Sequence, residues 1–97
     1  MTKPRKAPAH YLTGAPDHVA AIYDHPKTFD RYTVVYTWEP ERNGLQQARG
    51  MSERPQHPQG FGQIVTVMRG SHLGRLIAWA DLPEDCKRLV IQDGQPD

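Results

Sequence analysis

The stretch RYTVVYTWE, residues 31–39, carries the clearest strand signal in the chain. Apolar residues occupy every second position in it: Tyr32, Val34, Tyr36 and Trp38. Successive side chains of a strand point to opposite faces, so this alternation, broken only at Val35, predicts a strand with one face turned to a core. Aromatic residues make up only 8% of the chain. We therefore expect this aromatic row to pack in the core rather than to form a stacking platform for bases.

Shorter strands are predicted on both sides of this stretch. His18–Tyr23 has Val19, Ala21 and Tyr23 on one alternating face, and the turn-forming residues that follow it predict a hairpin with residues 31–39. Gln63–Met68 and Arg75–Trp79 are separated by a segment with two glycines. This spacing predicts a second hairpin.

One helix is predicted, over Asp81–Asp93. Asp81 is expected to cap it, with Pro83 in the first turn, Glu84 in capping-box spacing and Gly94 at the far end. The apolar residues of this segment recur at helical spacing, and they are Leu82, Cys86, Leu89 and Val90. Such a stripe must be buried, and one face of the sheet is the apolar surface that can cover it.

The resulting fold class is α+β, with an antiparallel sheet of about four strands in two hairpins and one C-terminal helix packed on one face. The chain has 97 residues, which is the size of one small domain. We expect a disordered basic tail over residues 1–10, a single domain over residues 11–94 and a short tail over 95–97. The unpaired edges of such a sheet make a homodimer conceivable.

The segment from Glu39 to Gly62 shows no period-2 pattern and contains three prolines and four glycines. We interpret it as a long loop, and loops of this length in compact domains are usually functional or disordered. Within it, a polar stretch rich in Pro, Gln and Gly carries a single large aromatic residue. The candidate binding residues are Arg54, Gln56, His57, Gln59 and Phe61.

The charge balance gives no general case for binding nucleic acid or an anionic membrane. Twelve basic residues stand against eleven acidic ones, for a formal net charge of +1. A nucleic-acid site would therefore depend on local arginines. The candidates are Arg31, Arg42, Arg49, Arg54, Arg69 and Arg75.

Catalytic and metal-binding patterns are weak. The five histidines have no ligand spacing, so we predict neither a metal nor a cofactor. Cys86, the single cysteine, lies on the apolar stripe of the helix, which favours a core residue over an activated thiolate. An enzyme would need His57 or His72 as general base beside a carboxylate such as Glu53 or Asp81.

Three stretches together resemble small uncharacterised proteins associated with phage and prophage-like genomes. They are Met51–Gln63, His72-Leu73-Gly74 and Asp81–Cys86. The resemblance spans roughly residues 11–93 and implies no established activity. It implies a bacterial or phage cytoplasmic setting and a small accessory protein that acts by binding.

The sequence thus leads to three hypotheses. The first is a non-enzymatic binding protein that engages a protein partner, such as a host protein, through the Pro/Gln/Gly-rich loop. The second is a nucleic-acid-binding protein that uses the sheet and loop arginines. The third is a small enzyme with a histidine general base. No apolar run is long enough to span a membrane, so we expect no membrane association.

Overall fold

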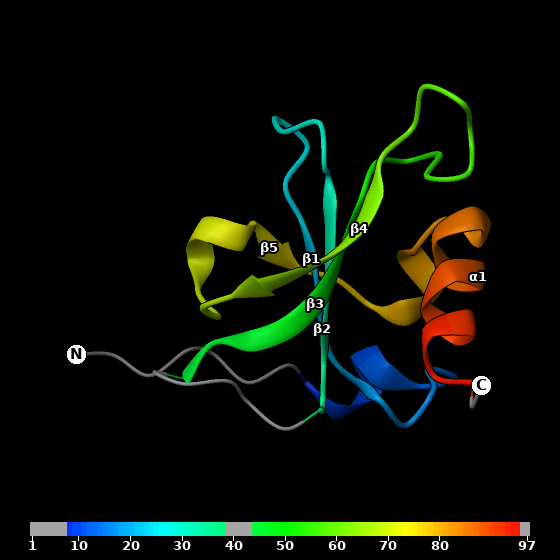
Figure 1. The fold of residues 1–97 in the computed structure, drawn as a ribbon. Helices are drawn as coiled ribbons and strands as arrows, with labels where there is room; N and C mark the ends of the chain where they lie inside the picture. Colours follow the sequence, from blue (N-terminus) through cyan, green and yellow to red (C-terminus); the bar gives the residue numbers. More distant parts are fainter. Residues whose placement is uncertain (1–7, 39–43, 96–97) are drawn as a thin grey trace.

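A computed structural model describes residues 8–38 and 44–95 (Figure 1). They form one antiparallel sheet of five strands and one C-terminal helix, which confirms the α+β class. The strands are β1 (Val19–Asp24), β2 (Tyr32–Tyr36), β3 (Gln46–Met51), β4 (Gly62–Val67) and β5 (Arg75–Leu76). The helix is α1 (Glu84–Asp93), and the 3-10 turns are η1 (Ala9–Leu12), η3 (Ser71–Leu73) and η4 (Trp79–Asp81).

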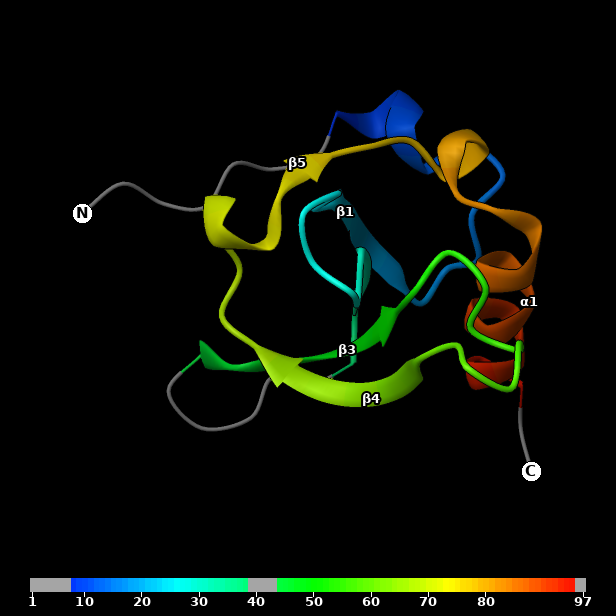
Figure 2. The same cartoon turned by 90° about the horizontal axis from the view of Figure 1, so that it is seen from above.

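The strand order is β4-β3-β2-β1-β5, which corrects two predictions. First, the predicted loop over residues 39–62 contains strand β3, placed between β2 and β4; residues 39–43 lie outside the described part. Second, β4 and β5 do not form a hairpin. They lie at opposite edges, because the chain crosses from β4 through η3 and returns to pair β5 with β1 (Figure 2).

The first hairpin, of β1 and β2, is confirmed, with one change in its pattern. The register shifts between Val19 and Ala21, which is the signature of a β-bulge. The bulge turns Val19 to the same side as Ile22, while Ala21 and Tyr23 face the other side. The single alternating face predicted for Val19, Ala21 and Tyr23 is therefore wrong.

Both faces of the sheet centre are covered, so every residue of β2 is buried. On the helix side, Tyr32, Val34 and Tyr36 pack with residues of α1 and η4. On the other side, Val35 packs in a smaller cluster with β1, β3 and β4. The prediction that the aromatic row belongs to the core is confirmed for Tyr32 and Tyr36, and Trp38 packs against the same cluster half-buried.

Helix α1 buries the predicted stripe. Cys86 and Val90 of α1 are buried, and Leu89 is partly buried against the same core, while Leu82, also buried, lies before the first residue of the helix. The predicted cap is wrong, because Asp81 belongs to η4 and no side chain caps the helix, which begins after Pro83.

The far end of α1 is closed by close packing against His18, the residue that precedes β1. Gly94 follows the last helical residue with a right-handed backbone conformation. A Cβ atom at this position would lie 2.2 Å from the ring of His18. His18 Nε2 in turn lies 2.7 Å from the Val90 carbonyl oxygen, so the ring takes the space that a side chain would need.

At the N-terminus, η1 begins at Ala9, inside the predicted tail. It contacts β1 and η4. Residues 1–7 of that predicted tail lie outside the described residues, as do residues 96–97 of the second tail.

Candidate functional site

An open groove of about 370 Å³ lies between two loops at one end of the sheet. One loop joins β1 to β2 and the other joins β3 to β4, and both project from the same end (Figure 1). We call this hollow the loop groove. The β1–β2 loop contributes Pro26, Thr28, Phe29 and Arg31, and the β3–β4 loop contributes Ser52, Glu53, Arg54, His57, Gln59 and Gly60.

The β3–β4 loop is folded by its own hydrogen bonds. At its base, Ser52 N donates to Phe61 O at 2.8 Å, and Phe61 N donates to the Ser52 hydroxyl at 3.0 Å. Inside it, Gly60 N donates to His57 O at 2.7 Å. A Cβ atom at Gly60 would lie 1.9 Å from the Arg54 carbonyl oxygen, so this tight path requires glycine. A stretch that resembles an unstructured linker in composition thus has a defined shape.

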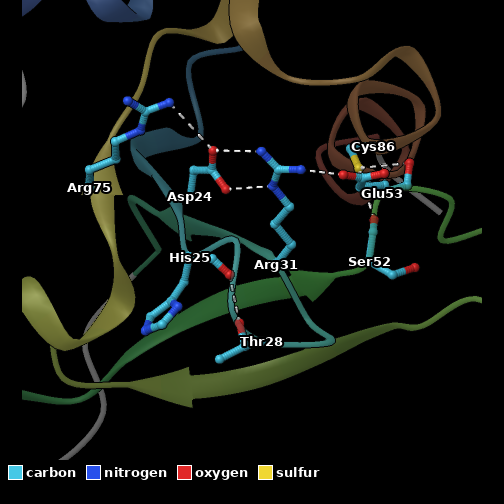
Figure 3. Close-up of polar contacts among 8 residues, drawn as sticks. All are labelled: Asp24, His25, Thr28, Arg31, Ser52, Glu53, Arg75 and Cys86. Atoms are coloured by element: carbon cyan, nitrogen blue, oxygen red, sulfur yellow. Dashed lines mark hydrogen bonds and ion pairs between the residues drawn. The ribbon is translucent and has the colours of Figure 1, made fainter.

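The β1–β2 loop is closed in a similar way. His25 N donates to Arg31 O at 2.8 Å, and both the N–H and the hydroxyl of Thr28 donate to His25 O (Figure 3). These bonds support Phe29, whose side chain is 67% exposed. Its ring meets the ring of Phe61 edge to face, with 6.0 Å between centroids. The two loops therefore meet through an aromatic pair with one face open to solvent.

A chain of charged groups links the two loops of the groove. Arg31 donates from Nε and Nη2 to the two carboxylate oxygens of Asp24, at 2.7 and 3.2 Å, and from Nη1 to Glu53 (Figure 3). Asp24 is buried at 4% exposure and Arg75 lies 3.9 Å from it. The bonds to Asp24 raise the pKa of Arg31 above its ordinary value. Arg31 thus ties β1 to the β3–β4 loop and fixes the separation of the groove walls.

The polar side chains of the wall differ in what they offer a ligand. Arg54 is exposed and makes no ion pair with any described residue, whereas Arg31 is paired with two carboxylates. His57 Nδ1 accepts a bond from Gln59 N at 3.1 Å, which leaves the proton of the neutral ring on Nε2. Arg54 and His57 can therefore both act as donors in the groove.

The sequence-predicted binding residues are largely brought together. Arg54, His57 and Gln59 line the groove, and Phe61 supports its aromatic edge by contact with Phe29. Gln56 lies exposed on the same loop without lining the groove.

The arginines proposed for nucleic-acid binding are dispersed, and two of them are neutralised. Arg49 binds Asp93 through Nη2 at 2.5 Å and Nε at 2.9 Å, with 14% of its side chain exposed, and Arg31 is bound as described above. Arg75 is exposed on β5, at the edge opposite β4, and Arg69 follows β4 half-buried. Arg42 lies outside the described residues.

The catalytic alternatives find little support in the geometry. Cys86 is fully buried, and desolvation raises the pKa of its thiol to about 12, so its expected place in the core is confirmed. Its Sγ lies 3.3 Å from the Ser52 carbonyl oxygen, to which it donates. His57 and Glu53 both line the groove, but Glu53 is bound by Arg31. His72 lies on η3, away from the groove lining.

No family model, curated protein or solved structure matches this chain.

Over residues 8–38 and 44–95, there is no group of three or more His, Cys, Asp or Glu side chains placed to hold a metal ion. The same residues include no helix with the length and apolar character needed to cross a membrane.

Sequence reasoning named Arg31 of the β1–β2 loop only as a nucleic-acid candidate and missed the rest of this loop. Phe29 and Arg31 line the groove, as residues of the predicted loop do, but Phe29 is not part of any periodic apolar pattern in the sequence. One sequence signal was available: Phe29 and Phe61 are the two phenylalanines of the chain, and both sit in polar, turn-forming surroundings where burial does not explain them.

Proposed function

We propose that this protein is a non-enzymatic binding protein that engages a peptide segment of a partner protein in the loop groove. The observation that carries the proposal is Phe29. It is a large aromatic side chain, 67% exposed, held by Phe61 at the rim of a groove whose walls are fixed by hydrogen bonds and an ion pair. Exposed aromatic anchors on pre-organised loops are typical of binding surfaces, because little entropy is lost on association.

The lining suggests the chemistry of the partner. Phe29 and Pro26 offer an apolar contact, and Arg54 and His57 offer donors at the opposite wall. A segment with an apolar side chain next to a carboxylate would satisfy both walls, because the unpaired guanidinium of Arg54 binds a carboxylate best. A phage accessory protein acting on a host protein in the cytoplasm is the setting we propose, on the strength of the sequence resemblance alone.

The test is a selection of random peptides on the immobilised protein, followed by titration of the selected peptides. We expect enrichment of sequences with an acidic residue beside an apolar one. Phe29→Ala and Arg54→Ala should each weaken binding by about tenfold or more, as for central residues of an interface. Ile91→Ala is the matched control, because Ile91 is also an exposed apolar residue but lies on α1.

Backbone amide shifts on titration would place the bound peptide. Shifts confined to residues 25–31 and 52–61 support the proposal. Selected peptides that shift other surfaces, or that bind Phe29→Ala and Arg54→Ala as tightly as wild type, would refute it. Single-stranded DNA or RNA that binds instead, with an affinity falling steeply as salt rises, would favour the nucleic-acid alternative.

A further inference from the structure

Strand β4 forms an edge of the sheet that lacks the usual protection. In the described part of the chain it has a neighbour, β3, on one side only. No charged residue and no proline occurs from Phe61 to Met68, and Ile64 and Met68 are 44% and 51% exposed. Edge strands normally carry charges, prolines or bulges that prevent pairing with another chain.

The opposite edge of the sheet, strand β5, has the protection that β4 lacks. Strand β5 is two residues long, and the side chain of Arg75 on it is 78% exposed. A short strand with a projecting charge is a poor template for pairing. Within residues 8–38 and 44–95, one edge of the sheet is thus protected and the other is open.

The register identifies which backbone groups of β4 are unpaired. Ser52 N donates to Phe61 O, and Ser52 lies opposite Phe61 in the continuation of the β3–β4 register. In an antiparallel pair, facing residues alternate between bonded and non-bonded. The backbone groups of Gln63, Val65 and Val67 are therefore directed at β3, and those of Gly62, Ile64 and Thr66 are directed outward.

We infer that β4 pairs with β4 of a second copy of this chain, antiparallel about a two-fold axis, to form a continuous sheet across a homodimer. A second copy fits because the outward N–H and C=O groups recur at every second residue, so that in antiparallel pairing each outward N–H of one copy meets an outward C=O of the other. The absence of charge on the strand means that self-pairing brings no like charges together. This inference does not depend on the proposed function of the loop groove.

The dimer should be weak. A single strand pair of six residues with a few flanking side chains buries less than the roughly 1,200 Å² of stable interfaces. We therefore expect a monomer–dimer equilibrium that depends on protein concentration. It should be insensitive to salt, because the paired strands carry no charge.

The decisive variant is Thr66→Pro, with Thr66→Ala as its control. Thr66 is exposed and its N–H points outward, so proline removes a donor that has no partner among the described residues and that the second copy would use. An edge strand tolerates proline at such a position. Sedimentation velocity over a concentration series should show a dissociation constant raised at least about tenfold for Thr66→Pro and unchanged for Thr66→Ala. Far-UV circular dichroism checks that both variants are folded.

Amide hydrogen exchange supplies a second readout that does not require a variant. The N–H groups of Ile64 and Thr66 should exchange fast in dilute protein and slowly in concentrated protein, whereas those of Gln63 and Val65 should be protected at both concentrations. If Thr66→Pro does not fold, Ile64→Lys replaces it, because a charge near the axis repels its copy. A protein that remains monomeric at about millimolar concentration, or variants that dimerise like wild type, would overturn the inference.

Discussion

Asp93, the last residue of α1, joins the helix to two strands, and its substitution tests how the helix is held on the sheet. Its carboxylate accepts hydrogen bonds from the Tyr36 hydroxyl and from Nε and Nη2 of Arg49. The side chains of Arg49 and Asp93 are 14% and 11% exposed. Burial, together with the bond to Asp93, raises the pKa of Tyr36, so its hydroxyl stays protonated and donates.

We expect Asp93→Asn to lower the free energy of unfolding by about 2 kcal/mol. The loss of hydrogen bonds to a charged group costs about 1.5 to 3 kcal/mol, and the Arg49 cation is left without its carboxylate. A smaller gain opposes this, because a carboxylate at a helix C-terminus is unfavourable by about 0.3 to 1 kcal/mol. For a domain of this size the midpoint of thermal unfolding should fall by about 10 °C.

Urea unfolding followed by tryptophan fluorescence and circular dichroism measures this change. Asp85→Asn is the control, because Asp85 is a more exposed carboxylate of the same helix, 3.9 Å from Arg88, and should change stability by less than about 0.5 kcal/mol. Combining Asp93→Asn with Arg49→Met should give a coupling energy above about 1 kcal/mol. Equal stabilities for Asp93→Asn and Asp85→Asn would show that the cluster does not hold the helix.

Three further predictions concern the core and the groove. Burial raises the pKa of Cys86 from about 9 to about 12, so the contribution of its protonated thiol to stability is complete below pH 9 and is lost as the pH rises toward 12. In equilibrium unfolding between about pH 9 and 10, Cys86→Ala should therefore reduce the slope with which the free energy of unfolding falls, by up to about 1.4 kcal/mol per pH unit. Arg31→Met should lower the free energy of unfolding, measured with urea, by about 2 to 3 kcal/mol, because it leaves the buried Asp24 carboxylate without its main partner. The exposed, more distant Arg75 should contribute less than about 0.5 kcal/mol when changed to Met, and equal losses for the two variants would contradict the assigned pairing. Gly60→Ala should lower the free energy of unfolding by more than about 1 kcal/mol and abolish peptide binding in the loop groove, because the added Cβ would collide with the Arg54 carbonyl oxygen. A variant with wild-type stability and binding would contradict this close approach.

The sequence predicted the elements whose pattern is local. Strand β2 follows from the alternation in residues 31–39, because a strand turns every second side chain to the same face. The stripe of α1 follows from helical spacing in the same way. The turn residues after Asp24 predicted the first hairpin, because a connection of that length favours antiparallel neighbours.

Strand β3 could not be found in this way. Gln46, Gln47, Arg49 and Gly50 have little strand preference, and no apolar alternation marks the segment. It is extended because β2 and β4 lie on both sides of it and satisfy its backbone groups. Arg49 is tolerated there because it meets Asp93, which lies 44 residues later in the sequence.

The loop groove, like the sheet, is predicted from the sequence only in part. Composition identified the β3–β4 loop, and Arg54, His57 and Gln59 do line the groove. The second wall comes from the β1–β2 loop, and nothing in the sequence indicates that Phe29 would meet Phe61 across it.

The sequence by itself determined the fold class, the first hairpin, the buried face of the helix and one of the two loops that form the groove. Each of these leaves a periodic or compositional pattern within one stretch of the chain, even where the contacts that bury it, as for the helix, come from distant residues. The tertiary structure alone decided the place of β3, the pairing of β5 with β1, the open edge at β4 and the meeting of the two loops. The strand pairings depend on backbone hydrogen bonds between segments, which form with little regard to side-chain identity. The meeting of the loops depends on side chains far apart in the chain, through the contact of Phe29 with Phe61 and the bond from Arg31 to Glu53.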